Sequence, residues 1–182
     1  MGMSITVPRY TVEDLERFPA DGSRYELLDG VLIVTPGPRL AHQRVAAGLV
    51  ARLWTAVEVP GIGCVAGPGT ISAPPFSQLE PDVLVFPARF GSAQKWTDVA
   101  EHWLAVEVLS RSSRFYDREF KRDAYFQLGV RQVWLVDIED RSVDVWHSRV
   151  GHEVVRDVIR WPVPASRLEV TIALADLFAG LA

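Results

Sequence analysis

The sequence predicts an α/β fold of the α+β kind, in which a mixed central β-sheet is flanked by helices. Three nearly continuous apolar runs, over residues 82–86, 103–109 and 132–137, predict strands that are covered on both faces. Between the second and third runs, residues 115–128 carry apolar side chains at helical spacing. This order of strand, helix and strand predicts a right-handed crossover between parallel strands.

Composition supports one folded domain over residues 1–182. A chain of 182 residues is close to the usual length of one domain. Its residues are 48% hydrophobic and 23% charged, so there are enough apolar side chains to form a core. A disordered chain is therefore excluded. The net charge of −4 counts modestly against a general electrostatic nucleic-acid binder, although it leaves room for a local basic strip.

Cysteine, histidine and hydropathy patterns exclude several further classes. The single cysteine, Cys64, cannot form an internal disulfide or a CxxC pair, and the four histidines lack zinc-binding spacings such as HxxxH. The N-terminus has no apolar signal-peptide core, and no stretch approaches the ~18 apolar residues of a membrane helix. We therefore expect a cytoplasmic protein with no membrane partner.

The N-terminal third is predicted to form a short helix, a hairpin and a long helix. Thr11 is a typical N-cap, and two apolar runs within residues 24–35 flank Asp29-Gly30, the pair that favours a tight hairpin turn. Residues 39–57 carry one apolar stripe at helical spacing. The domain is thus expected to have an N-terminal helix and hairpin before its central sheet.

Weaker patterns complete the predicted fold. Residues 61–79 are rich in glycine and proline with short apolar pieces, which fits either weak strands or a long loop. Residues 142–147 and 152–157 predict a closing hairpin that turns near Gly151. A short helix over residues 174–178 ends the chain.

Glu107 is the most informative residue, because it lies inside the apolar run WLAVEVL. Burying a carboxylate is costly unless a partner or a metal compensates it, so the plain alternative is an ion pair with an arginine. Asp82 follows Pro81 at the start of the preceding strand, where aspartate is also a common turn residue. Neighbouring strands lie ~4.8 Å apart, so the two acids could share one divalent cation, and oxygen ligands suit Mg²⁺ or Mn²⁺.

Two further residues are candidates for the same site. Glu26 lies in an apolar stretch of the predicted hairpin, although taken alone it is better explained as a solvated strand position. Lys121 shares a helix face with Asp117 and Tyr125 at i, i+4 spacing, and its helix begins just after the strand of Glu107. The plain alternative is a surface pair between Asp117 and Lys121, whereas the functional interpretation places the amine beside the acid cluster.

The segment 109–131 is locally basic, with six basic and three acidic residues. A positive strip beside an acid cluster is suited to a polyanion held against a metal. A solvated helix face explains the same charges without any ligand. The basic residues are Arg111, Arg114, Arg118, Lys121, Arg122 and Arg131.

Taken together, these residues resemble a bacterial group of restriction endonucleases within the PD-(D/E)xK nuclease superfamily. The resemblance extends from about Tyr10 to the final helix, and it implies a restriction-endonuclease-like fold. Its motifs are short, but their order and spacing are fairly specific. In chain order they are YELLDG (25–30), His42, Pro81-Asp82, VEVLS (106–110), Tyr116-Asp117, Lys121, Tyr125, Gly129-Val130 and WLVD (134–137).

Carried over residue by residue, the resemblance implies a metal site. Asp82 and Glu107 would be metal ligands, helped by the backbone carbonyl of Val108, and Glu26 would be a further acid that holds the metal or its water shell. Such a metal, Mg²⁺ or Mn²⁺, binds the scissile phosphate and lowers the pKa of a bound water.

The lysine departs from the superfamily motif. That motif places the lysine two residues after the second acid, where this chain has Leu109. In the group resembled, the lysine comes instead from the next helix, which corresponds to Lys121. It would orient the attacking water or offset charge that builds on the phosphate. Whether Lys121 reaches the acids therefore decides whether the site can be active.

These observations favour an enzyme, with other classes left open. The favoured function is a Mg²⁺-dependent endonuclease that hydrolyses phosphodiester bonds in DNA, with Glu26, Asp82, Glu107 and Lys121 as its catalytic residues. The alternative is a non-catalytic binding or assembly module of the same fold, which the net charge of −4 and the leucine at position 109 favour. A metal hydrolase of small phosphate esters is a third possibility. A homodimer is expected because double-strand cleavage needs two sites.

Overall fold

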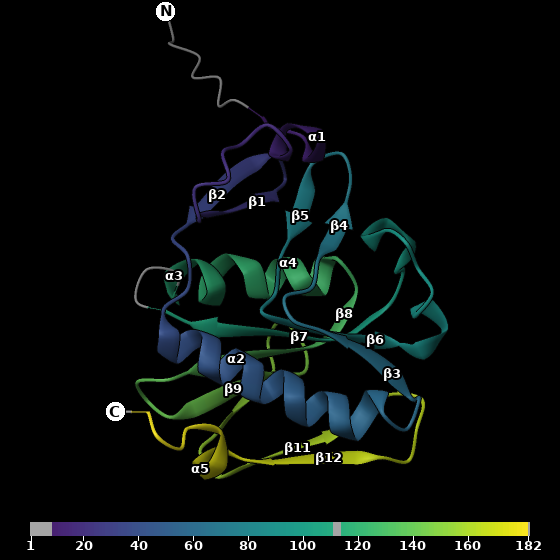
Figure 1. Ribbon diagram of the computed structural model, residues 1–182, viewed down its shortest axis with the longest axis vertical. Coiled ribbons are helices and arrows are strands. Elements are labelled where there is room, and N and C mark those ends of the chain that lie inside the picture. The colour runs from purple at the N-terminus through teal and green to yellow at the C-terminus, as the bar shows by residue number, and fades with distance from the viewer. Residues whose placement is uncertain (1–8, 111–113, 182) are drawn as a thin grey trace, which may run out of the picture.

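A six-stranded mixed sheet forms the centre of the computed structural model, which describes residues 9–110 and 114–181. Its strands are β3 (Gly63–Ala66), β6 (Val83–Pro87), β7 (His102–Leu109), β8 (Val130–Asp137), β9 (Ser142–Trp146) and β10 (His152–Val155). They lie in the order β10-β9-β8-β7-β6-β3 (Figure 1). The central pair β7 and β8 is parallel, and the other neighbours are antiparallel. The predicted fold class, a mixed sheet flanked by helices, is confirmed.

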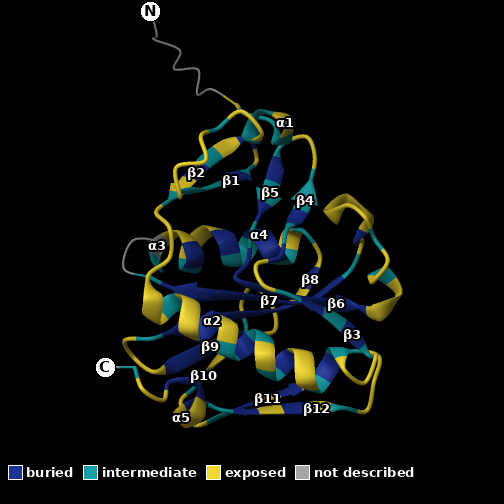
Figure 2. Cartoon of the chain, in the orientation of Figure 1, coloured by how far each residue is buried: buried dark blue, intermediate teal, exposed yellow. Residues whose placement is uncertain are grey.

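The connection between β7 and β8 is the helix predicted over 115–128. It consists of α3 (Arg114–Tyr116), the π-helical turn η4 (Asp117–Lys121) and α4 (Arg122–Gln127). Gly129, with φ +85°, ends it in a conformation that glycine adopts without strain. All eight residues of β7 are buried, as the continuous apolar run requires (Figure 2).

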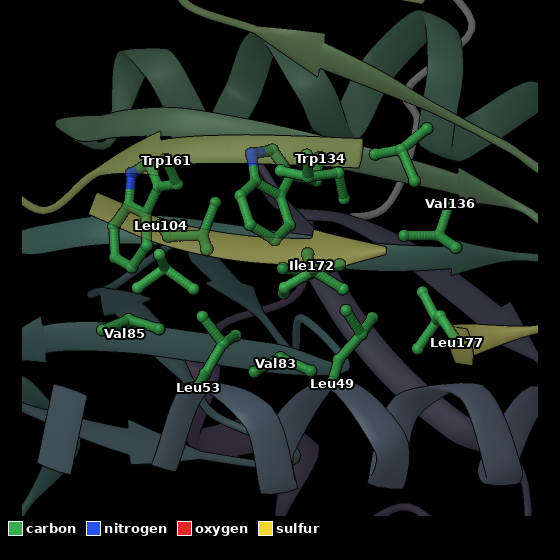
Figure 3. Packing of buried hydrophobic residues seen from close by; sticks show 14 of the residues in the cluster. Leu49, Leu53, Val83, Val85, Leu104, Trp134, Val136, Trp161, Ile172 and Leu177 are labelled. Carbon is green, nitrogen blue, oxygen red and sulfur yellow. The ribbon is translucent and has the colours of Figure 1, made fainter. Parts of the chain in front are cut away.

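Helices and strands cover both faces of the sheet. On one face, α2 (Leu40–Leu53) packs Leu49 and Leu53 against the sheet, together with Trp161 from a C-terminal hairpin (Figure 3). On the other face, α4 contributes Ala124 and Tyr125 to a second cluster. The predicted helix over 39–57 is thus formed by α2 and the π-helical turn η1 (Trp54–Glu58).

A second, four-stranded sheet has the order β2-β1-β5-β4. The predicted hairpin forms its first two strands, and Asp29 and Gly30 both adopt positive φ in the turn, at 51° and 81°. The segment 61–79 forms strands rather than one long loop. The bounds are β1 (Arg24–Leu28), β2 (Val31–Thr35), β4 (Ile71–Ala73) and β5 (Ser77–Leu79). Because only a few residues join β5 to β6, this sheet brings β1 close to the start of β6.

The remaining elements are short. The predicted N-terminal helix is α1 (Val12–Leu15), and the predicted final helix is α5 (Leu174–Leu177). The predicted hairpin near Gly151 is formed by β9 and β10. The hairpin of β11 (Val158–Pro162) and β12 (Glu169–Ala173) was not predicted. Along the described chain, no helix is both long and apolar enough to cross a membrane.

Two short 3₁₀ helices complete the secondary structure. They are η2 (Ala88–Phe90) and η3 (Trp96–Asp98), and both lie in the connection between β6 and β7. Neither contains a buried residue. The connection is therefore mostly exposed, although Val99 after η3 is buried in the second cluster, and it leaves β6 at the opposite end from Asp82.

Candidate active site

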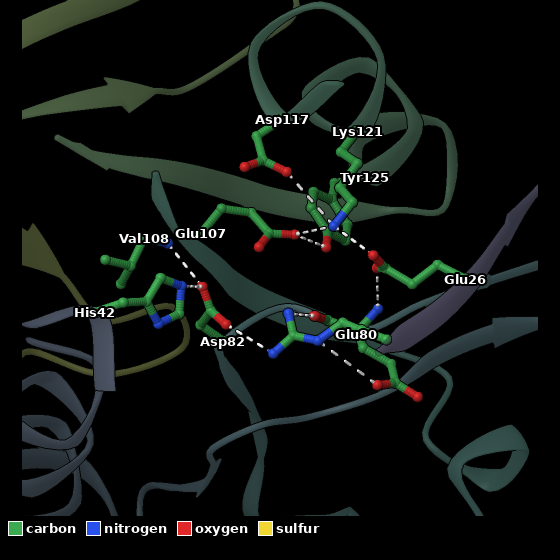
Figure 4. Close-up of polar contacts among 10 residues, drawn as sticks. Glu26, His42, Glu80, Asp82, Glu107, Val108, Asp117, Lys121 and Tyr125 are labelled. Atoms are coloured by element: carbon green, nitrogen blue, oxygen red, sulfur yellow. Dashed lines mark hydrogen bonds and ion pairs between the residues drawn. The ribbon is translucent and has the colours of Figure 1, made fainter. Parts of the chain in front are cut away.

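The amine of Lys121 lies among three buried carboxylates (Figure 4). Its Nζ is 2.6 Å from Glu26 Oε2, 3.3 Å from Glu107 Oε1 and 3.5 Å from Asp117 Oδ1. The Lys121 side chain is only 2% exposed, so the surface pair considered from the sequence does not hold. Glu26 is fully buried, so it is not a solvated strand position either. The structure thus brings Glu26, Glu107 and Lys121 together.

The local fold explains why these side chains meet. Glu107 lies near the end of β7, and the helix that returns to β8 passes over that end. Within this helix, Asp117, Lys121 and Tyr125 recur every four residues and point towards Glu107 (Figure 4). The hydroxyl of Tyr125 donates a hydrogen bond to Glu107 Oε1 at 2.5 Å. A π-helical turn spans Asp117 to Lys121, a feature often found at functional sites.

Asp82 lies beside this cluster with partners of its own. Arg24 donates to its Oδ1 at 3.0 Å, while the backbone N–H of Val108 donates to its Oδ2 at 2.8 Å. His42 Nε2 lies 3.0 Å from the same Oδ2. Burial works against ionisation, but the His42 hydrogen bond and the nearby charges of His42 and Arg24 hold the pKa of Asp82 below its usual value. Asp82 is therefore an anchored carboxylate that makes no ion pair with Lys121.

Backbone contacts join the two halves of the site. The N–H of Glu80 donates to Glu26 Oε1 at 2.8 Å, and Arg24 donates to the carbonyl of Glu80 at 3.0 Å. Glu80 and Asp82 flank Pro81 just before β6, whereas Glu26 and Arg24 belong to β1. The second sheet is thereby fixed to the start of β6. The positions of Glu26 and Asp82 consequently depend on each other.

The cluster carries more negative than positive charge. Four buried carboxylates, those of Glu26, Asp82, Glu107 and Asp117, face two permanent cations, Lys121 and Arg24, so with all four acids ionised and His42 neutral the formal charge is −2. Burial raises the pKa of Glu107 well above its usual value, and the charges of Asp117, Asp82 and Glu26 raise it further against the opposing effect of Lys121. The site is therefore short of positive charge.

Residue type and charge fit a divalent cation. Carboxylate oxygens are the ligands that Mg²⁺ and Mn²⁺ prefer, and a missing charge of two matches such an ion. Glu107 uses one oxygen, Oε1, for both Lys121 and Tyr125, and Figure 4 shows its second oxygen on the side of Asp82. Within the described ranges, no three Asp, Glu, His or Cys side chains already converge as a metal cage.

The basic strip expected near Lys121 is neutralised within the protein. Each described basic residue of the segment 109–131 contacts an acid, so the strip offers less free charge to a polyanion than its composition indicated. Arg111 lies outside the described residues. Apart from Lys121, the pairs are Arg114–Asp137, Arg118–Asp144, Arg122–Asp123 and Arg131–Glu101.

Three contributors to the site were not assigned a role from the sequence. Arg24 and His42 hold Asp82 from β1 and α2, which are distant in sequence. His42 was named only as part of the family resemblance, and no pattern pointed to Arg24. Tyr125 was placed on the face of Lys121 by its spacing, but the contact with Glu107 depends on how the helix packs. The i, i+4 spacing was therefore a usable signal for Tyr125.

Comparisons with known proteins identify a family and a fold. The family model Uma2, described as "Putative restriction endonuclease", matches residues 12–180. A crystal structure described as "a putative nuclease belonging to DUF820", from Anabaena variabilis ATCC 29413, is similar with a TM-score of 0.74. Its sequence is 21% identical, and the match covers 93% of this chain and 97% of that chain. No match was found among curated proteins.

Proposed function

We propose that this chain, which belongs to the Uma2 family of restriction-endonuclease-like proteins, is a metal-dependent endonuclease that hydrolyses phosphodiester bonds in DNA. The observation that carries the proposal is the buried cluster of four carboxylates, three of them around the Lys121 amine and the fourth, Asp82, beside them, which lacks two positive charges when all four are ionised. A stable core gains nothing from such an imbalance. A divalent cation bound among these carboxylates would supply the missing charge.

Asp82 and Glu107 would hold the cation, with Glu26 as a third acid. The N–H of Val108 faces Asp82, and the carbonyl of the same residue lies on the same strand edge, where it can add a ligand. When bound, Mg²⁺ or Mn²⁺ neutralises charge on the phosphate and lowers the pKa of a bound water. His42 and Arg24 would keep Asp82 ionised and oriented for this role.

Lys121 would act on the reacting phosphate. Its ammonium has three N–H donors and faces three carboxylates, so it can keep its contacts with Glu26 and Glu107 and turn the donor that faces Asp117, the longest contact, towards a water or a phosphate oxygen. A buried cation at this point offsets negative charge that builds in the transition state. As double-strand cleavage requires two such sites, we further propose that the active form is a homodimer.

The neutralised basic strip favours the second candidate, a non-catalytic module of the same fold. Four arginines that face acids on their own chain provide little attraction for DNA. Such a module keeps the fold and has no need to bind a metal or cleave a phosphodiester. The two candidates therefore differ in an assay of cleavage.

The test is cleavage of supercoiled plasmid DNA with Mg²⁺ or Mn²⁺. Wild type is expected to nick or linearise the plasmid, and to stop when the metal is chelated. Glu107→Ala and Lys121→Ala are expected to lower the rate at least about 100-fold, because each removes a group that acts on the phosphate or its metal. Lys95→Ala is the matched control, since Lys95 is exposed and is the other lysine of the chain. Equal cleavage by all four proteins would point to a contaminating nuclease.

A further inference from the structure

The two oxygens of Glu107 are used unequally. Oε1 accepts a hydrogen bond from Tyr125 at 2.5 Å and lies 3.3 Å from the Lys121 amine. These contacts come from one direction, because Lys121 and Tyr125 lie one turn apart on the same helix face. With Oε1 held, the second oxygen is directed to the opposite side, towards Asp82 (Figure 4).

Tyr125 is suited to hold a carboxylate in place. Its side chain is fully buried, and it packs in the cluster formed by α4 and the sheet, so the ring has one fixed position. A phenol hydroxyl turns about a single bond, whereas the ammonium of Lys121 ends a long flexible stem. Lys121 is also shared among Glu26, Glu107 and Asp117, while the one acid that Tyr125 contacts in the described site is Glu107.

We propose that Tyr125 is a positioning residue, which fixes the rotamer of Glu107 and presents its second oxygen to the divalent cation. This inference rests on the proposed function. Partners that hold metal ligands in place from outside commonly change metal affinity about 10- to 100-fold when they are removed. Tyr125 would not touch the substrate or the cation.

A purely structural role for Tyr125 predicts something different. A buried tyrosine hydroxyl needs a partner, and Glu107 supplies one, so the hydrogen bond could serve stability alone. In that case Tyr125→Phe would lower the melting temperature and leave metal affinity unchanged. A positioning role predicts a loss of metal affinity at a temperature where the variant is fully folded.

The test is calorimetric titration of the full chain with Mn²⁺ alone. Tyr125→Phe is expected to bind Mn²⁺ about 10- to 100-fold more weakly than wild type. Tyr25→Phe is the matched control, because it also removes a tyrosine–carboxylate hydrogen bond, between Tyr25 and Asp21 at the surface. Its affinity is expected to equal that of wild type. In a Glu107→Gln background, Tyr125→Phe should have no further effect, since Tyr125 acts through Glu107.

The outcomes separate this inference from the function on which it rests. If wild type binds Mn²⁺ and Tyr125→Phe binds equally well, the positioning role is overturned and the proposed function stands. If wild type does not bind Mn²⁺, both are overturned. Should Tyr125→Phe be unfolded at the temperature of the titration, the titration is repeated at a lower temperature at which it is folded, and the same loss of affinity is expected.

Discussion

Lys121→Met is expected to make the folding of this protein depend on a divalent cation. The substitution keeps the length of the buried side chain but removes the charge that lies among Glu26, Glu107 and Asp117. Breaking a buried ion pair by removing one partner costs about 3–5 kcal/mol of unfolding free energy, because the remaining charges are uncompensated. Mg²⁺ or Mn²⁺ can supply the missing charge, so millimolar cation should raise the melting temperature of this variant more than that of wild type.

Thermal melts with and without the cation measure this effect. Lys95→Met is the matched control, because Lys95 is exposed and its loss should change neither the stability nor its dependence on metal. A Lys121→Met protein that is destabilised but gains nothing from either cation would show that the carboxylates do not form a metal site. The activity of the variant is not needed for this conclusion.

Glu107→Gln is expected to abolish cleavage while leaving the protein at least as stable as wild type. The amide keeps the shape of the side chain and can still accept from Tyr125, but it is a poor ligand for Mg²⁺. Cleavage should fall at least about 100-fold. The same change removes one of four neighbouring buried carboxylates and so lowers their mutual repulsion, which should keep or raise the free energy of unfolding. Loss of activity without loss of stability is common at residues that serve function rather than stability. Glu153→Gln, on exposed β10, is the matched control.

The stability difference between Glu107→Gln and wild type should grow with pH. Burial and the neighbouring acids raise the folded-state pKa of Glu107 above its usual value of 4.5. A raised carboxyl pKa means that its stabilising contribution is present below pH 4.5 and is lost as pH rises through the folded-state pKa. Denaturant unfolding of both proteins without metal, from pH 4.5 upwards, measures the difference. A constant difference over that range would contradict the raised pKa of Glu107.

Much of the fold could be predicted because its signals are local. The continuous apolar runs of β6, β7 and β8 and the Asp-Gly turn each lie within a few residues. The β11–β12 hairpin was missed because its pattern is short, with only Ile159 and Trp161 buried on β11 and Val170 and Ile172 buried on β12. Pro162 at the end of β11 also weakens the strand signal.

The site was predictable where a charge interrupts an apolar run. Glu26 and Glu107 stand out for that reason, and both are buried as that position implies. Arg24 and His42 carry no such signal, because their contacts with Asp82 join elements 58 and 40 positions apart in the chain. Counting the charges within one segment overestimated the basic strip around Lys121. Arg114 and Arg118 form ion pairs with Asp137 on β8 and Asp144 on β9, and these contacts exist only in the folded chain.

Titration of the metal-free protein with Mn²⁺ tests the central claim, that the buried acids form a cation site. Wild type and Glu153→Gln are expected to bind with the same affinity, whereas Glu107→Gln should bind at least about tenfold more weakly, because a ligand is lost. If wild type does not bind Mn²⁺, or if Glu107→Gln binds it with the same affinity as wild type, the claim that these buried carboxylates form a cation site is wrong.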